Sequence, residues 1–357
     1  MGPGDTMRAS VKEKAIAAGF AMFRATGVHR LAKFARGAGV ILMFHHVRPW
    51  VERDFAPNRL LEITPEFLDT VLETLRAEGF DIVTLDEVMR RLAAGGEGPP
   101  FAALTFDDGY RDNLEHALPV LRRHNAPFAL YVATGFADRS ARLWWVELEA
   151  AVRRLDRIEL DIDGLKLVMP AATGDEKTAA FRSVYWALRG GPEADMLAAI
   201  AILAKQAGVD GGAIAEKLCL DWDGLRQIAA DPLCTIGVHT LTHPMLAKHD
   251  ADFVRHELAQ SRAIIEGEIG RPAVHLAYPV GDTTSAGPRE FAMAEELGFK
   301  SAVTTRPGML FADHANHLTA LPRLSINGNW QDRTFVEVLL TGAPFALWNR
   351  GRRANVG

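Results

Sequence analysis

Two adjacent carboxylates, Asp107 and Asp108, stand between the apolar run 101–106 and Gly109. Adjacent residues of a strand point to opposite faces, so two like charges in succession suit either a turn or a shared site. Asp-Gly is ordinary turn chemistry, whereas in a site the two carboxylates would divide one task between them. These residues by themselves leave both interpretations open.

A pair of histidines favours the site. His239 and His243 form the pattern H-T-L-T-H after the apolar run 235–238. On one turn of helix or in a tight loop, this spacing places both imidazoles on one side, where they can share a metal ion. Two surface histidines are the alternative for this pattern alone, but a carboxylate at a neighbouring strand end strengthens the metal interpretation.

Asp108, His239 and His243 would leave positions open on a divalent ion, which is typical of catalytic rather than structural sites. If Asp108 binds the ion, Asp107 is free to act as a general base. The ion lowers the pKa of a water molecule, and Asp107 accepts the proton as that water attacks. Gly109 lets the chain turn away sharply after the pair.

The motifs T-F-D-D-G, H-T-L-T-H and A-Y-P-V-G occur in that order within residues 101–326. They resemble the polysaccharide deacetylases of the nodulation-type chitooligosaccharide deacetylase family, carbohydrate esterase family 4. The resemblance implies a distorted (β/α) barrel, a divalent metal that is usually zinc (Zn²⁺), and hydrolytic removal of N-acetyl, less often O-acetyl, groups from sugars. It implies Asp107 as the base, Asp108, His239 and His243 as metal ligands, and the backbone N–H of Val280 as a donor that stabilises the oxyanion.

Two positions depart from the family's pattern. Ala277 stands about where many members have an arginine that orients the base, and L-P-R-L at 321–324 lacks the histidine that supplies the general acid. Members with an A-Y-P motif often share both departures, so loss of activity does not follow. Arg323 is a candidate for the missing arginine beside Asp107, with a structural salt bridge as the alternative. M-F-H-H-V resembles a strand of the same subgroup that brings His45 towards the site, with a buried structural histidine as the alternative.

The expected elements explain how these residues would meet. Short apolar runs alternate with segments of helical period, which is typical of β-α-β units and a parallel sheet. Seven or eight mainly parallel strands predict an α/β fold, a distorted (β/α) barrel with its site at the carboxyl ends of the strands. We expect strands at 39–47, 81–85, 101–106, 127–133, 235–239, 273–279, 300–305 and 318–326, and helices at 64–80, 85–96, 111–125, 252–270 and 288–299.

The chain is expected to have an N-terminal helical segment at 1–38, the barrel at 39–345 and a basic tail at 346–357. Residues 140–221 interrupt the rhythm with a hairpin pattern at 157–169 and mostly helical segments, which predicts an insertion over one face of the barrel. The insertion opens with Trp144 and Trp145, a pair typical of a core, although a tryptophan beside a site can also hold a sugar.

Charge is unevenly distributed along the 357 residues: the net charge is +5 over residues 1–40, +3 over the last 17 and −5 overall. The acidic body argues against a nucleic-acid partner. Residues 11–35 indicate a helix with basic residues between apolar ones, which either packs on the main domain or makes peripheral contact with the anionic inner membrane surface. No convincing signal sequence or membrane-spanning run is present, so we expect a cytoplasmic enzyme.

The leading interpretation is a metal-dependent N-deacetylase acting on an N-acetylated oligo- or polysaccharide or a lipid-linked saccharide. A 2-His-1-carboxylate iron enzyme is a weaker alternative, because Leu241 stands where such sites carry the acid. A non-catalytic saccharide-binding or membrane-peripheral protein is the other alternative, and the intact Asp107 counts against it. The sequence leaves the sugar, the linkage, the metal and the oligomeric state open.

Overall fold

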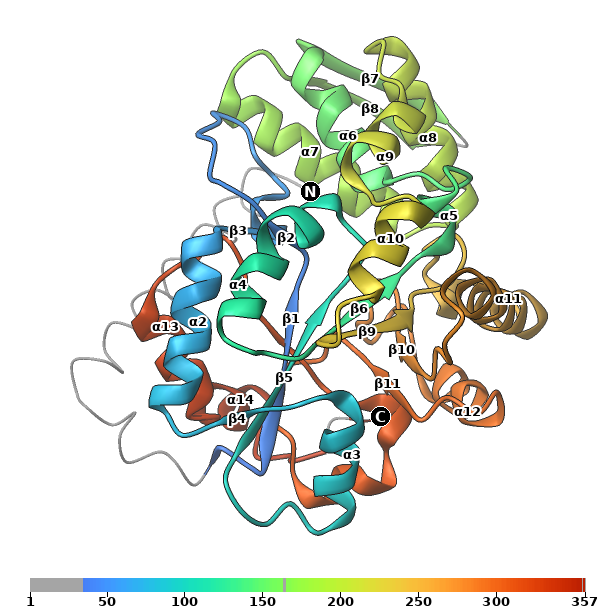
Figure 1. Ribbon diagram of the computed structural model, residues 1–357. Coiled ribbons are helices and arrows are strands. Elements are labelled where there is room, and N and C mark those ends of the chain that lie inside the picture. The colour runs from blue at the N-terminus through green and yellow to red at the C-terminus, as the bar shows by residue number, and fades with distance from the viewer. Residues whose placement is uncertain (1–34, 163–164, 355, 357) are drawn as a thin grey trace.

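The computed structural model describes residues 35–162, 165–354 and 356, and its centre is a parallel sheet of eight strands (Figure 1). Seven strands follow one another in the order β11-β10-β9-β6-β5-β1-β12, and β4 pairs with the start of β5. The strands are β1 (Gly39–Phe44), β4 (Asp81–Ile82), β5 (Phe101–Phe106), β6 (Phe128–Val132), β9 (Cys234–Val238), β10 (His275–Ala277), β11 (Ser301–Val303) and β12 (Leu324–Ser325).

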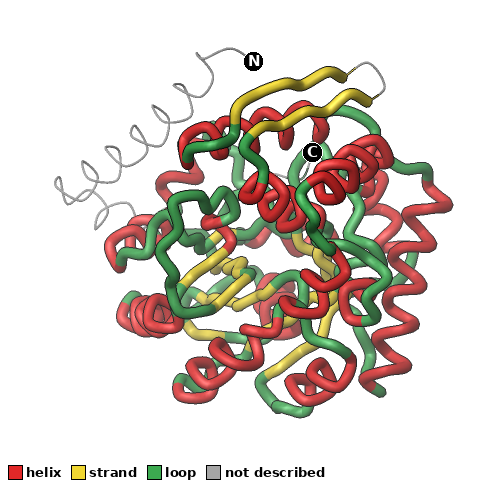
Figure 2. Tube along the Cα trace, turned by 90° about the horizontal axis from the view of Figure 1, so that it is seen from above, coloured by secondary structure: helices red, strands yellow, loops and turns green. Residues whose placement is uncertain are grey.

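The sheet curls until one segment of chain joins its two edges. Leu321 pairs with Val303 of β11, and three residues later Leu324 pairs with Leu42 of β1. Viewed from above, the strands surround the centre and helices lie outside them (Figure 2). The fold is therefore the distorted (β/α) barrel that the alternation of elements predicted.

Several of the helices, among them α2 and α11, begin at polar caps, which satisfy N–H groups that a helix end leaves unpaired. Thr64 accepts from the N–H of Phe67 at the start of α2, and Asp250 accepts from that of Phe253 at the start of α11. The helices are α2 (Pro65–Ala77), α3 (Leu85–Ala93), α4 (Leu118–Arg123), α5 (Thr134–Ala137), α6 (Trp144–Arg154), α7 (Gly174–Arg189), α8 (Glu193–Gln206), α9 (Gly211–Leu218), α10 (Trp222–Ala229), α11 (Ala251–Ile269), α12 (Pro288–Glu296), α13 (Arg333–Leu340) and α14 (Ala343–Trp348).

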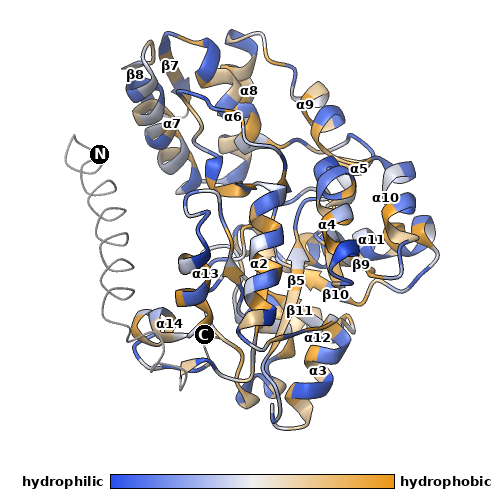
Figure 3. Ribbon diagram, turned by 60° about the vertical axis from the view of Figure 1, so that its left-hand side comes forward, coloured by the Kyte–Doolittle hydropathy of each residue, from blue (hydrophilic) through white to orange (hydrophobic). Residues whose placement is uncertain are grey.

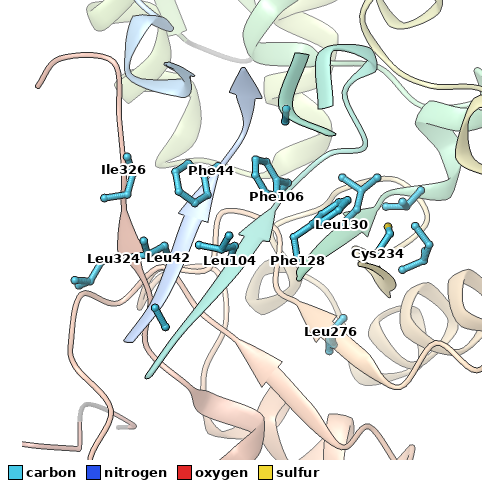
Figure 4. Packing of buried hydrophobic residues seen from close by; sticks show 14 of the residues in the cluster. Leu42, Phe44, Leu104, Phe106, Phe128, Leu130, Cys234, Leu276, Leu324 and Ile326 are labelled. Atoms are coloured by element: carbon cyan, nitrogen blue, oxygen red, sulfur yellow. The ribbon is translucent and has the colours of Figure 1, made fainter. Parts of the chain in front are cut away.

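Burial on both faces explains the apolar runs of the central strands. Phe44, Phe106 and Phe128 lie side by side on the face that packs against the helices, with ring centroids 5.0 and 5.7 Å apart (Figure 4). Ile41 and Tyr131 belong to a second cluster that fills the other face of the same strands. The hydropathy colouring shows the same division, with apolar strands inside and polar helix surfaces outside (Figure 3).

The insertion lies above the carboxyl ends of the strands, at the top of Figure 1. It contains α6 to α9 and an antiparallel hairpin of β7 (Arg157–Ile162) and β8 (Leu165–Pro170). Its apolar side chains, among them Leu148, Phe181 and Ile200, form a cluster of their own. Within the described residues no single helix is long and apolar enough to span a membrane; α8 and α9 meet the criteria of length and composition only as a pair bent by 97°.

Three expected elements differ in the structure. Residues 318–326 are not one strand but a turn of 3₁₀ helix (Leu318–Ala320) followed by the short β12, because Pro322 has no N–H for the ladder. The helix expected at 111–125 starts as a π-helix (Asn113–Ala117) before α4. The run 39–47 divides into β1 and β2 (His46–Val47), and β2 pairs with β3 (Glu62–Ile63) in a separate sheet.

Two further expectations cannot be compared with the structure. Residues 11–34 of the expected N-terminal helix and the Asp-Gly turn at 163–164 lie outside the described residues.

Candidate active site

The carboxyl ends of β1, β5, β9 and β10 open into one cavity of about 800 Å³ beneath the insertion. Six of the seven residues singled out in the sequence line it: His45, Asp107, Asp108, His239, His243 and Val280. The seventh, Arg323, lies behind the cavity wall with 1% of its surface exposed. The fold thus brings together at one site residues that lie far apart in the sequence, from His45 to Arg323.

Asp108, His239 and His243 form a cluster suited to a metal ion. The Oδ1 atom of Asp108 lies 3.5 Å from Nε2 of His239 and 3.4 Å from Nε2 of His243, and the three ligand atoms lie within 4.8 Å of one another. Oδ1 is buried and has no hydrogen-bond donor. Nδ1 of His239 lies 2.7 Å from the carbonyl of Ala277, a contact that places the ring proton on Nδ1 and the lone pair of Nε2 towards Asp108. One carboxylate and two imidazoles fit a divalent ion such as zinc, with positions left open.

The ionisation of these groups favours a bound cation. Burial lowers the pKa of His243 to about 4, so its imidazole is neutral near pH 7. Burial also lowers the pKa of His239, but Asp108 and Asp107 more than offset that effect and raise it overall. Burial raises the pKa of Asp108, and the two histidines reverse that and hold it well below its usual value. Asp108 is therefore a buried, ionised carboxylate beside two imidazoles, an arrangement that attracts a cation.

Asp107 faces a different partner from Asp108. Arg323 donates two parallel hydrogen bonds to it, Nη1 to Oδ1 and Nη2 to Oδ2, each 2.7 Å long. Burial raises the pKa of Asp107, and the charge and hydrogen bonds of Arg323 outweigh that and lower it. The guanidinium is itself held by the Thr304 carbonyl and Thr105 Oγ1. The expected contact between Arg323 and Asp107 is therefore present.

Arg323 reaches Asp107 by a route that the sequence did not predict. We expected it within a strand at 318–326. It instead lies just before β12, within the barrel wall, and its side chain extends towards the cavity from inside. The break in the expected strand at Pro322 places it there.

The H-T-L-T-H segment is a loop rather than a helix, and a buried carboxylate of α11 holds it. Glu257 accepts hydrogen bonds from the N–H groups of Leu241 and Thr242 and from the Thr242 hydroxyl. Thr240 Oγ1 accepts from the N–H of His243. The sequence analysis did not identify Glu257, because a glutamate within an amphipathic helix gives no sign that it faces inward.

Four residues of the site share an unusual backbone conformation. Asp108, Thr240, His243 and Val280 have φ between 61° and 72°, and they are four of the seven non-glycine residues with positive φ in the described part of the chain. This conformation is strained for a β-branched residue such as Val280, and strain of this kind concentrates at functional sites. Asp108 and His243, the two proposed metal ligands with this conformation, both line the cavity.

Aromatic rings enclose the histidines. Trp145 and Phe136 pack against His243 with ring centroids 4.8 and 5.7 Å away. Trp144 and Trp145 are both buried and also line the cavity, so the pair belongs to the hydrophobic core and to the wall of the site. The role of Phe136 could not be seen in the sequence, because α5 carries no motif.

His45 faces the cavity from the end of β1. Asn113 Nδ2 donates a 2.7 Å hydrogen bond to its carbonyl and fixes the backbone there. Burial lowers the pKa of its imidazole, and the charges of Asp107 and Asp108 oppose that effect. The neighbouring His46 points elsewhere, since its Nδ1 lies 2.6 Å from the Asp112 carboxylate.

Residues 94–302, more than half of the chain, match the family model described as polysaccharide deacetylase. Among solved structures, the fold is similar to that of the Streptococcus pyogenes deacetylase PplD in complex with acetate, at 18% identity and a TM-score of 0.56, over 84% of this chain and 97% of that chain. It is also similar to IcaB from Ammonifex degensii, at 17% identity and a TM-score of 0.51, over 84% and 97% of the two chains. No curated protein matches the chain. Identities this low show a common fold, whereas the match over residues 94–302 shows that the chain belongs to the polysaccharide deacetylase family of hydrolases.

Proposed function

We propose that this protein is a metal-dependent N-deacetylase of saccharides, with Asp108, His239 and His243 as metal ligands and Asp107 as general base. One observation carries the proposal: adjacent carboxylates face different partners. Asp108 points at two imidazoles, while Asp107 is held by a guanidinium 2.7 Å away. A turn would not require the two carboxylates to face different partners. Hydrolysis that uses one metal ion and one general base does require it.

The residues of the chain support each step of acetamide hydrolysis. A divalent ion, when bound, supplies Lewis acidity and lowers the pKa of a water molecule, and zinc suits the three ligands. Asp107, kept ionised and oriented by Arg323, accepts a proton from the attacking water. The N–H of Val280, in its left-handed turn at the cavity, donates to the oxygen that becomes negative. We assign to His45, which lines the cavity with Asp107 and Asp108, the transfer to the departing amine of the proton that Asp107 takes from the water.

The test is acetate release from a panel of N-acetylated oligosaccharides, polysaccharides and lipid-linked saccharides, with zinc and with chelator. We expect release that requires the metal. O-acetylated analogues in the same panel separate ester from amide hydrolysis. Binding without any release by the metal-loaded protein would favour the non-catalytic alternative, and metal-dependent oxygen uptake would favour the iron alternative.

We further propose that the enzyme acts in the cytoplasm, at the inner surface of the membrane. Besides the apolar and basic pattern of residues 11–35, the end of the described chain supports membrane contact. Leu347 and Trp348 are 76% and 63% exposed, and Arg350, Arg352 and Arg353 follow them at the surface. Exposed leucine and tryptophan beside arginines suit an interface with anionic lipid.

Sedimentation with vesicles tests this location. Vesicles rich in anionic lipid should retain the protein, and the double variant Leu347→Ser, Trp348→Ser should be retained less. Val168→Ser, which removes a 51% exposed apolar side chain from the hairpin, is the control. Equal retention by neutral vesicles, or recovery of the native protein from the periplasm, would contradict the proposal.

A further inference from the structure

A row of aromatic rings leads from the surface of the insertion to the proposed metal site. Trp186 and Tyr185 lie on the face of α7 that lines the cavity, with ring centroids 5.1 Å apart. The Tyr185 ring lies 5.6 Å from that of Trp144, which lies 5.5 Å from that of Trp145. Trp145 in turn packs 4.8 Å from the ring of His243. We call the four rings from Trp186 to Trp145 the aromatic track.

The aromatic track opens to solvent at one end. Trp144 and Trp145 are buried, Tyr185 is partly exposed, and Trp186 is 53% exposed. Four of the seven tryptophans of the chain, these three and Trp330 from the loop after β12, line this one cavity. A single exposed apolar ring needs no explanation, but a continuous row that leads into a reaction cavity is typical of a surface that binds the rest of a substrate.

Arg189 holds the outer end of the aromatic track in place. Its Nη1 donates a 2.6 Å hydrogen bond to the Tyr185 hydroxyl, and its Nη2 donates one to the Asp282 carboxylate. Its guanidinium carbon lies 5.5 Å from the centre of the Trp186 ring. The guanidinium is thus occupied by contacts within the protein and supports the two rings. Because these rings are held in advance, a ligand that stacks on them loses less free energy in ordering them.

A hydrogen-bond acceptor lies beside the inner end of the aromatic track. The Asn58 Nδ2 donates to the Trp145 carbonyl at 3.0 Å and to the Glu149 carboxylate at 2.8 Å, and these two acceptors fix the orientation of the amide. Asn58 lines the cavity, and no donor from the described residues contacts its Oδ1. An aromatic ring face beside a fixed acceptor suits a sugar, which has an apolar face and a rim of hydroxyl groups. A lipid tail would leave the amide oxygen without a partner.

We propose that the aromatic track is a binding site for further sugars of the substrate chain: the acetylated sugar lies beside Trp145 and Asn58, and the sugars joined to it stack on Tyr185 and Trp186. The inference rests on the proposed deacetylase function, because it places the acetamide at the end of the track that contacts His243. The substrate is then a chain of several sugars, and the outer rings make the rate depend on the length of that chain.

The test uses a series of oligosaccharides of one N-acetylated sugar, from the single sugar to the hexamer, with rates compared per acetamide group. For the zinc-loaded wild type we expect kcat/KM to rise by roughly 10- to 100-fold along the series, which is the effect of burying one aromatic side chain. In Trp186→Ala the gain from added sugars should fall towards one, while Trp186→Phe, which keeps a ring, should retain most of it. Leu197→Ala, which removes a 45% exposed apolar side chain from the neighbouring helix α8, is the control and should keep the full gain.

A binding measurement separates this inference from the proposed function. Calorimetry with Asp107→Asn, which lacks the proposed base, measures the affinity for each saccharide of the series without rapid turnover. If no saccharide releases acetate from the wild type, but longer chains bind more tightly and Trp186→Ala removes that difference, the deacetylase proposal fails and the sugar site stands. Equal affinity for short and long chains, or the same gain in Trp186→Ala as in the wild type, would overturn the inference. A gain from an alkyl glycoside of the single sugar that added sugars do not give would also overturn it, and would assign the aromatic track to a lipid.

Discussion

Asp107 and Asp108 are neighbours in the chain, but substitution of each should have a different effect. Asp107→Asn removes the base and leaves the three metal ligands, so metal content should persist while acetate release falls by about 10²–10⁴-fold. Asp108→Asn should lower metal content itself, because the buried Oδ1 is the atom that faces both imidazoles. Metal analysis of both purified variants beside an acetate assay checks this. Loss of metal from the Asp107 variant alone would reverse the two roles.

Arg323 should not be replaceable by lysine. The guanidinium makes two parallel bonds to Asp107 and two more to Thr304 and Thr105, and an ammonium cannot reproduce that planar pattern. We expect Arg323→Lys to lower kcat by about 10²-fold through misplacement of the base. Arg323→Gln should also cost about 3–5 kcal/mol of unfolding free energy, because it leaves Asp107 buried without a counter-charge. Unchanged turnover in a folded Lys variant would assign the orienting role to another residue.

At the scale of elements, the sequence predicted most of the barrel because its central strands are buried on both faces and several of its helices begin at side-chain caps. β1 and β5 are buried throughout; β5 was expected to the residue, and β1 begins where it was expected but ends three residues earlier, at Phe44 rather than at 47. Elements held by tertiary contacts were not predicted. At the two-residue pair β2–β3, Glu62 forms ion pairs with Arg48 and Arg53, and no local sequence pattern encodes those contacts.

The site was predictable to the extent that its residues stand at the ends of predictable strands. Asp107, His239 and His45 follow β5, β9 and β1 directly, so the topology of the barrel dictates their convergence. Glu257, Phe136 and the α7 face were not found, because each acts through a fold-level contact and belongs to a segment with an ordinary helical pattern.

The pairing of β10 with β11 includes a buried histidine, which predicts a pH effect on stability. Burial lowers the pKa of His275 to about 4, and its Nδ1 lies 2.8 Å from Ser301 Oγ. The unfolded chain takes up this proton near pH 6.5, before the folded protein does, so stability falls as the pH drops below 6.5. Between pH 7.5 and 5 the loss from this residue should be roughly 2 kcal/mol.

Urea unfolding of the wild type and His275→Asn at both pH values measures that contribution. The variant should lose less unfolding free energy than the wild type between pH 7.5 and 5. His256→Gln, which changes an exposed histidine on α11, is the control and should behave as the wild type does. The same loss in all three proteins would mean that His275 does not titrate as proposed.

At the scale of the whole molecule, two separately packed bodies of side chains meet at the cavity. One hydrophobic cluster lies between the sheet and its helices, and another lies within the insertion and around α5 and α6. The proposed metal ligands come from the ends of β5 and β9, at the boundary between the two clusters. The two hydrophobic clusters therefore pack without the ion. The proposed ion would join only the loops that follow β5 and β9.

Metal removal should follow from this arrangement. Glu257 holds the H-T-L-T-H loop by protein contacts alone, so the chelated protein should remain folded and lose its activity. Zinc that binds only the folded state should then raise the unfolding free energy by about 2.7 kcal/mol at a free concentration 100 times its Kd. Thermal unfolding with chelator and with added zinc measures the shift, and Asp108→Asn should show almost none. A wild-type protein that unfolds on chelation would show a structural ion, and one whose transition zinc leaves unmoved would lack the predicted site.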